Sequence, residues 1–137
     1  MMKTILHLDG LKHWTPLSKG KILCKNVRLT NFGDIYPFVT VFPDAENVFI
    51  DSCNKNFVYY WADKSTFPNA KNLYLKSHPC ESIVFRRKFE SINVHEAYRR
   101  YVERWGGSNA HVVSDEEYDK LINSFTEIPY DFETDKE

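Results

Sequence analysis

The 137-residue chain is long enough to form one domain with its own hydrophobic core, without disulfides or metals. Its 42% hydrophobic and 27% charged residues are close to the globular average, which excludes a wholly disordered protein. The formal net charge of -1 hides an asymmetry, because the residues after Val113 contain nine acids and only two lysines. We interpret this acidic end mainly as a segment that keeps the C-terminal part solvated.

Cysteine use and hydropathy indicate where the protein works. Cys24, Cys53 and Cys80 are odd in number and widely spaced, so they do not form a disulfide framework. No apolar run reaches the length of a membrane helix, and the first residues lack a secretory signal. We therefore expect an intracellular protein, cytoplasmic or nuclear, with reduced thiols and no membrane contact.

An internal repeat is the strongest pattern in the part of the chain before Cys80. Residues 42–53 (FPDAENVFIDSC) return at 67–78 (FPNAKNLYLKSH), and residues 6–11 and 26–32 align with the same unit at a similar, slightly shorter spacing. Each unit contains an apolar-x-apolar strand signal. The expected inward-facing pairs are Leu6/Leu8, Val27/Leu29, Val48/Ile50 and Leu73/Leu75. An antiparallel β fold is the alternative, but its usual strand spacing of about 8–12 residues fits poorly.

This unit resembles the leucine-rich repeat, whose members run about 20–29 residues with the pattern L-x-x-L-x-L-x-x-N/C-x-L. The resemblance covers about residues 4–80 and includes Ala70 where many repeats have Leu. Cys53 and His78 fall at or near the place of the asparagine that usually links successive turns. The resemblance implies an α/β fold, a short solenoid of parallel strands. With its degenerate repeats, the chain resembles small repeat proteins that large DNA viruses encode. This resemblance implies an accessory protein that acts on host factors inside the host cell.

The residues after Leu75 predict a different organisation. We expect a short strand at 83–85, which closes or truncates the stack, and a helix at about 94–105 capped by Asn93. A short strand at 112–113 and a helix at about 115–125, opened by a capping box at Ser114, follow. The sequence thus predicts a single domain over 1–127, with repeats at about 4–80 and a helical cap at about 81–127, and a flexible acidic tail at 128–137.

The outward position of each strand and the positions that flank it predict a binding surface. In a solenoid these positions line the exposed sheet, where aromatic residues beside arginine are typical interface anchors. The predicted partner-binding residues are His7, Arg28, Phe49, Asp51, Tyr74 and Lys76. The alternative is that Phe49 and Tyr74 pack against a C-terminal helix of the same chain. We also consider a homodimer that covers the open end of the stack.

A basic region between the repeats and the last helix suggests a second hypothesis. The possible nucleic-acid-binding residues are Arg86, Arg87, Lys88, Arg99, Arg100 and Arg104. Aromatic neighbours favour nucleic acid, whereas the interleaved Glu90, Glu96 and Glu103 favour a solvated face with local ion pairs. We therefore rank nucleic acid below a protein partner.

Catalysis and cofactors are the third and weakest hypothesis. The chain lacks the phosphate-binding glycine loops and the common hydrolase and zinc-protease motifs. Cys53, His78 and Cys80 are the best candidates for a metal site or a Cys-His pair, although they lack a metal-ligand spacing and a third orienting group. The sequence therefore predicts a non-enzymatic protein-binding module without a cofactor.

Overall fold

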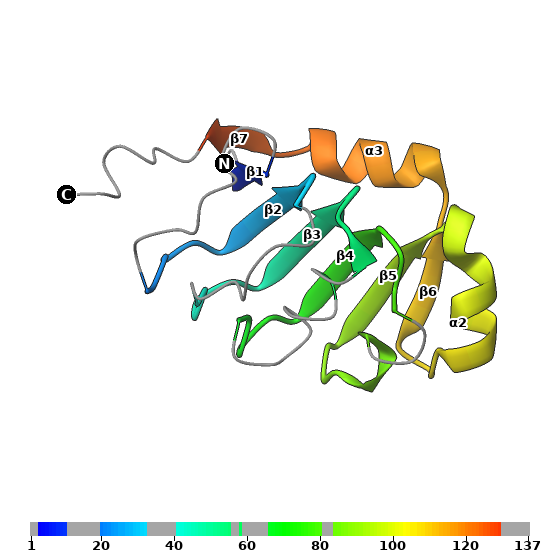
Figure 1. Ribbon diagram of the computed structural model, residues 1–137. Helices are drawn as coiled ribbons and strands as arrows, with labels where there is room; N and C mark the ends of the chain where they lie inside the picture. Colours follow the sequence, from blue (N-terminus) through cyan, green and yellow to red (C-terminus); the bar gives the residue numbers. More distant parts are fainter. Residues whose placement is uncertain are drawn as a thin grey trace.

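The computed structural model describes residues 3–10, 20–32, 41–55, 58, 66–80 and 84–129. These residues form a seven-stranded parallel sheet with the strand order β6-β5-β4-β3-β2-β1-β7 (Figure 1). The strands are β1 Thr4–Asp9, β2 Asn26–Thr30, β3 Asn47–Asp51, β4 Asn72–Lys76, β5 Ser91–His95, β6 Ala110–Val113 and β7 Thr126–Pro129. Among the described residues, the helices α2 (Arg99–Trp105) and α3 (Asp115–Asn123) accompany the sheet. The α/β class with parallel strands is confirmed.

The repeat sets the register of the first four strands. Val27 pairs with Leu6 on one side and with Val48 on the other, and Val48 pairs with Leu73. These are the partners that the spacing of the repeat predicts. Because side chains alternate between the faces of a strand, equal register places each apolar pair beside the next. The predicted pairs of β2, β3 and β4 are all fully buried, whereas Leu6 in β1 is only partly buried.

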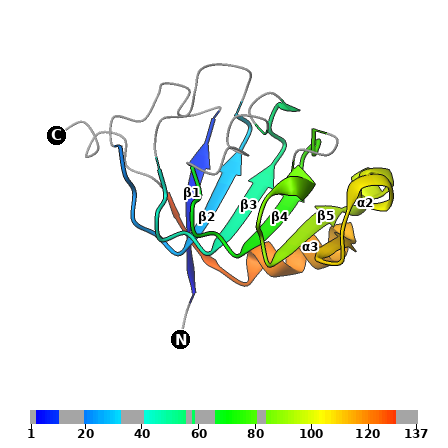
Figure 2. The same ribbon diagram turned by 90° about the horizontal axis from the view of Figure 1, so that it is seen from below.

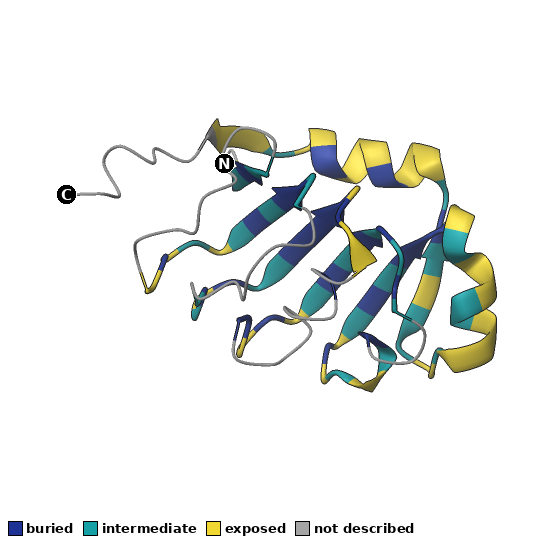
Figure 3. Cartoon of the chain, in the orientation of Figure 1, coloured by how far each residue is buried: buried dark blue, intermediate teal, exposed yellow. Residues whose placement is uncertain are grey.

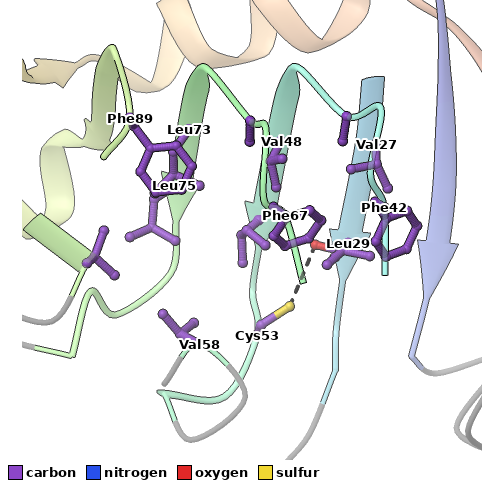
Figure 4. Packing of buried hydrophobic residues seen from close by; sticks show 14 of the residues in the cluster. Val27, Leu29, Phe42, Val48, Cys53, Val58, Phe67, Leu73, Leu75 and Phe89 are labelled. Atoms are coloured by element: carbon purple, nitrogen blue, oxygen red, sulfur yellow. Dashed lines mark hydrogen bonds between the residues drawn. The ribbon is translucent and has the colours of Figure 1, made fainter. Parts of the chain in front are cut away.

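The inner face of the sheet packs against the segments that connect the strands (Figure 4). Phe42 and Phe67 begin the Phe-Pro turns of two successive units, and their rings stack with centroids 5.3 Å apart. Cys53 belongs to the same core, where its Sγ lies 3.6 Å from the Leu29 carbonyl oxygen. Buried thiols of this kind behave as small hydrophobic groups.

Asparagine side chains link the strands at their amino ends. Nδ2 of Asn47 donates to Oδ1 of Asn26 (2.8 Å), and Nδ2 of Asn72 donates to Oδ1 of Asn47 (2.9 Å). Ser91 continues the series, because its hydroxyl donates to Oδ1 of Asn72 (2.8 Å). At the other end, Nδ2 of Asn26 donates to the Thr4 carbonyl oxygen. The ladder therefore lies at the first residues of β2 to β5 and not at the positions of Cys53 and His78.

Two predicted elements in the 83–105 region are wrong. Val84–Arg86 is a single 3-10 turn, η1, where a strand was expected, and Ile83 lies outside the described residues. The expected helix at 94–105 begins later, because Ser91–His95 forms β5, followed by a 3-10 turn, η2 (Glu96–Tyr98), and then α2. Ile92 and Val94 are fully buried beside Leu73 and Leu75. Burial and pairing with the open edge of β4 outweigh the helical pattern there.

The C-terminal elements cross the sheet from one edge to the other. The short strand expected at 112–113 is confirmed as part of β6, and the capping box at Ser114 opens α3, as predicted. Helix α3 lies across the face opposite the inner core, and β7 then pairs with β1 (Figures 1 and 2). Ile128 and Pro129, which we assigned to the tail, therefore belong to the sheet, while residues 130–137 lie outside the described residues. No described helix is long and apolar enough to cross a membrane.

Candidate interaction surfaces

The predicted partner-binding residues share one face of the sheet, and α3 covers the middle of it. Phe49 is 1% exposed, so the expectation that it is exposed is wrong. Its ring stacks on Tyr74 (4.4 Å, 9°) and meets the edges of Tyr118 (6.1 Å) and Phe125 (5.6 Å). Packing against a C-terminal helix, which the sequence left open, is the observed arrangement. Docking of the amphipathic face of α3 buries Phe49 and Tyr118 and leaves Tyr74 and Phe125 partly buried.

The polar residues of this face form a network at the carboxyl ends of β1, β2 and β3. Arg28 donates through Nη2 to Oδ2 of Asp51 (2.9 Å), and Nε2 of His7 lies 2.7 Å from Oγ1 of Thr30. Glu127 of β7 contacts Nδ1 of His7 and lies 3.7 Å from Nη1 of Arg28. The four polar members of the predicted partner-binding residues therefore all contact other residues of the chain. His7, Arg28 and Asp51 do so in this network, and Lys76 contacts Asp115 at the start of α3.

Asp115 at the first turn of α3 fixes the helix to the sheet. Its Oδ1 lies 2.8 Å from Nε2 of His95 and 3.0 Å from Nζ of Lys76. The hydrogen bonds from His95 and from Lys76 lower the pKa of the Asp115 carboxyl, and the same contact raises the pKa of Lys76. The Tyr118 hydroxyl is buried without a hydrogen-bond partner among the described residues, and burial raises its pKa. The contacts of Asp115 with His95 and Lys76 therefore hold the start of α3 against the sheet.

A groove lies at the amino ends of β1 and β2. The polar network around Arg28 and Asp51 lies at the other, carboxyl ends of the strands. The groove has a volume of about 720 Å³. Its apolar lining comes from Leu6, Ile22, Leu23, Cys24 and Ile128, and its polar lining from Lys3, Thr4, Lys25, Asn26, Glu46 and Asn47. Leu23 is 68% exposed and Ile128 is 46% exposed. A second hollow, lined by Leu23, Cys24, Lys25, Pro43, Asp44, Glu46, Asn69 and Lys71, continues the groove toward β4.

Sequence reasoning did not identify this groove. Leu23 stands between Ile22 and Cys24, outside the repeat pattern that marks the core, and that position was its only signal. Ile128 was assigned to the tail, and only its pairing with Leu6 brings it to the groove. Tyr98 of η2 and Val102 of α2 pack on the inner face near β5 and β6, whereas among the described residues no helix packs on the inner face at β1 and β7, where α3 contacts only the opposite face through Ile5.

The predicted basic residues occupy η1, the turn after it, and α2. Arg86, Lys88, Arg99, Arg100 and Arg104 are exposed and Arg87 is partly buried, as Figure 3 shows for α2. Within the described part of the chain none of them forms an ion pair, although Glu96 and Glu103 are close in sequence. The guanidinium of Arg100 lies over Tyr101 (5.1 Å) and that of Arg104 over Trp105 (5.0 Å). The local ion pairs that we considered for this face are therefore not found in this part of the chain.

The cysteine and histidine candidates are separately engaged. Cys53 is buried, which raises the pKa of its thiol to about 12, and burial also raises the pKa of Cys24 to about 11. Nδ1 of His78 accepts from the Cys80 amide (3.0 Å), and its Nε2 lies 3.0 Å from the Tyr101 hydroxyl. Among the described residues no three His, Cys, Asp or Glu side chains are grouped as metal ligands.

Comparison with known proteins places the chain among viral sequences. The model of a family of unknown function (DUF5845) matches residues 27–106. Uncharacterized protein R849 of Acanthamoeba polyphaga mimivirus is 33% identical over 81% of this chain and 79% of its own length. Uncharacterized protein L163 of the same virus is 30% identical over 93% of this chain and 95% of its own length. No solved structure is significantly similar.

Proposed function

The chain belongs to this family of unknown function (DUF5845), and we propose that it is a non-enzymatic, leucine-rich-repeat-like module that binds a protein partner in the groove at β1 and β7. The observation that carries the proposal is the exposure of Leu23 and Ile128 in one groove, beside the inner face at β1 and β7, where no described helix packs. Repeat stacks bury their apolar ends under caps, so two exposed aliphatic side chains at this end favour a partner.

The leucine-rich-repeat-like assignment is supported by the periodic part of the fold. The strands recur at nearly constant spacing and in equal register, and asparagine side chains connect them along one edge. The backbone connections recur as well, because the amides of Asn47, Asn72 and Ser91 donate to the carbonyl oxygens of Lys25, Glu46 and Lys71, respectively. In such proteins function resides in the surfaces of the stack rather than in the fold itself.

The charges around the groove favour an acidic partner. Glu46 lies 3.5 Å from Lys71, which pairs the groove's glutamate. Lys3 and Lys25 line the groove and form no ion pair with another described residue. The partner that fits is an extended segment with one large apolar side chain, which contacts Leu23 and Ile128, flanked by carboxylates near the two lysines. Because the relatives are mimivirus proteins, we propose that the module acts inside the host cell, on a host protein.

Selection from a random 12-residue peptide library, followed by anisotropy titration of the selected peptides, tests this proposal. We expect selected peptides to combine Asp or Glu with one large apolar residue. Leu23→Asp should weaken their binding about 10- to 100-fold, because burying a leucine side chain contributes about 1.5–3 kcal/mol. The matched control is Leu121→Asp, which alters a 37% exposed leucine on α3, outside the groove. Its binding should stay within twofold of the original chain.

Three outcomes would overturn the proposal. Equal weakening by both substitutions would mean that added charge, and not the groove, controls binding. A monomeric original chain that selects no peptide would remove the groove as a binding site. Sedimentation analysis covers the homodimer: a dimer that Leu23→Asp dissociates would mean that a second copy, not an acidic host segment, occupies the groove.

A further inference from the structure

The exposed side of α2 carries arginines that form no ion pair within the described part of the chain. Tyr98 and Val102 of η2 and α2 pack against the inner core, which fixes the helix. Arg99, Arg100 and Arg104 point away from that contact and are exposed. Each of the last two lies over the aromatic ring that follows it in the sequence, so its position is held without a carboxylate partner. Their charges remain available to an external anion.

Hydrogen-bond counting at Tyr101 adds a neutral donor to this surface. The Cys80 amide donates to Nδ1 of His78, so in the neutral ring the proton is on Nε2. Nε2 of His78 then donates to the Tyr101 oxygen (3.0 Å), and Nη2 of Arg100 points to the same oxygen (3.4 Å). Both neighbours are donors, so the proton of the Tyr101 hydroxyl has no acceptor among the described residues. A partly buried hydroxyl in this state favours a ligand that is only an acceptor.

Arg100 and Arg104 are one helical turn apart and therefore lie one above the other on the same side of the helix. Trp105 is 38% exposed next to them, which adds an aromatic surface suited to base stacking. Glu96 and Glu103 form no ion pair with these arginines, so the two acids do not neutralise the surface by direct contact. The two guanidinium groups and the Tyr101 hydroxyl can donate to phosphate oxygens, and the exposed indole of Trp105 can stack on a base. Together these groups fit the phosphates and bases of a nucleic acid.

We propose that this side of α2 binds the phosphate backbone of single-stranded nucleic acid, with Arg100, Tyr101 and Arg104 as the phosphate-contacting residues. Guanidinium groups present paired N–H donors to phosphate oxygens, and the Tyr101 hydroxyl donates to the same or the neighbouring phosphate. Trp105 stacks on a base without selecting its identity. This surface is separate from the groove at β1 and β7, so the chain can bind nucleic acid whether or not the groove binds a protein.

Fluorescence anisotropy with fluorescein-labelled 15-nucleotide oligo-dT and oligo-U, titrated from 50 to 200 mM salt, tests the proposal. We expect binding that weakens with salt. Arg100→Gln with Arg104→Gln should reduce affinity at least tenfold at 50 mM salt. It should also reduce the slope of log K against log salt by about 1.4, because each single-strand phosphate contact contributes about 0.7. Tyr101→Phe should weaken binding a few-fold at every salt concentration and leave the slope unchanged, since it removes a donor without a charge.

The control removes two positive charges elsewhere, by Lys55→Gln with Lys120→Gln, both exposed residues outside α2. Its affinity should stay within twofold, and unfolding curves of all variants should coincide. Equal loss of affinity and slope in the control would overturn the proposal, because general charge attraction would then explain binding. Failure of the original chain to bind either oligonucleotide at 50 mM salt would also overturn it, as would binding to phosphatidylserine vesicles alone.

Discussion

Replacement of Phe49 by alanine tests how firmly α3 is docked on the sheet. The side chain is 1% exposed and contacts Tyr74, Tyr118 and Phe125. Truncating a buried Phe to Ala costs about 3–5 kcal/mol, and each aromatic pair contributes about 0.5–1.5 kcal/mol beyond the burial of its surface. We therefore expect Phe49→Ala to lower the free energy of unfolding by about 4 kcal/mol. Phe49→Leu keeps most of the volume and should lose less than half of that.

Urea denaturation followed by circular dichroism measures the loss, and Tm should fall by an amount on the order of 10–20 °C. Amides of α3 should also exchange with solvent faster, because the helix loses its main contact. Leu121→Ala, on the exposed side of the same helix, should stay within about 0.5 kcal/mol. A loss below about 1 kcal/mol for Phe49→Ala would refute the docked helix. The sheet face with Phe49 and Tyr74 would then again be a candidate contact surface for a partner.

Three other measurements test separate parts of the structure. Asn47→Ala removes both ladder bonds of one asparagine and should cost about 1–3 kcal/mol in urea denaturation, whereas Asn123→Ala at the exposed end of α3 should cost less than about 0.5 kcal/mol. The pKa of Asp115 is lowered below its ordinary value of 3.8, so its carboxylate stabilises the fold above that pH and loses this effect as the pH falls through the lowered value. Asp115→Asn should therefore flatten the decline of stability below about pH 4; an unchanged decline would contradict the contact with His95 and Lys76. Burial raises the pKa of Cys53 from 9.0 to about 12, so iodoacetamide at pH 8 should alkylate it roughly a thousandfold more slowly in the folded chain than in urea, and equal rates by mass spectrometry would show that the thiol is accessible.

The first four strands could be predicted from the sequence because each one repeats the same local pattern. Apolar pairs such as Val48 and Ile50 recur together with turn residues, so a short stretch of sequence predicts both the strand and its register. The same repeat also contains Asn26, Asn47 and Asn72, so the asparagine ladder at the strand starts could have been predicted from the sequence. Strand β5 has the same alternation at Ile92 and Val94, but it follows β4 at a shorter spacing than the earlier strands keep, and helical signals come directly after it.

The candidate surfaces depend on contacts between distant segments, which local patterns do not encode. The apolar face of α3 was visible at Tyr118 and Ile122, but the sequence did not determine whether it docks on Phe49 or elsewhere. The groove requires Ile128 to pair with Leu6, although the two lie near opposite ends of the sequence. The basic residues were expected on a solvated face. Within the described residues they have no carboxylate partner and the Tyr101 proton has no acceptor, and both features depend on side-chain geometry.

The pairing of β7 with β1 determines when the sheet can be completed. The Thr126 amide donates to the Lys3 carbonyl oxygen, so the first strand obtains its second neighbour from a segment synthesised long after it. During synthesis on the ribosome, β1 has one open edge until that segment has left the exit tunnel, while β2 to β6 can already stack in order. Because β7 follows all the other described strands in the chain, its pairing with β1 completes the sheet.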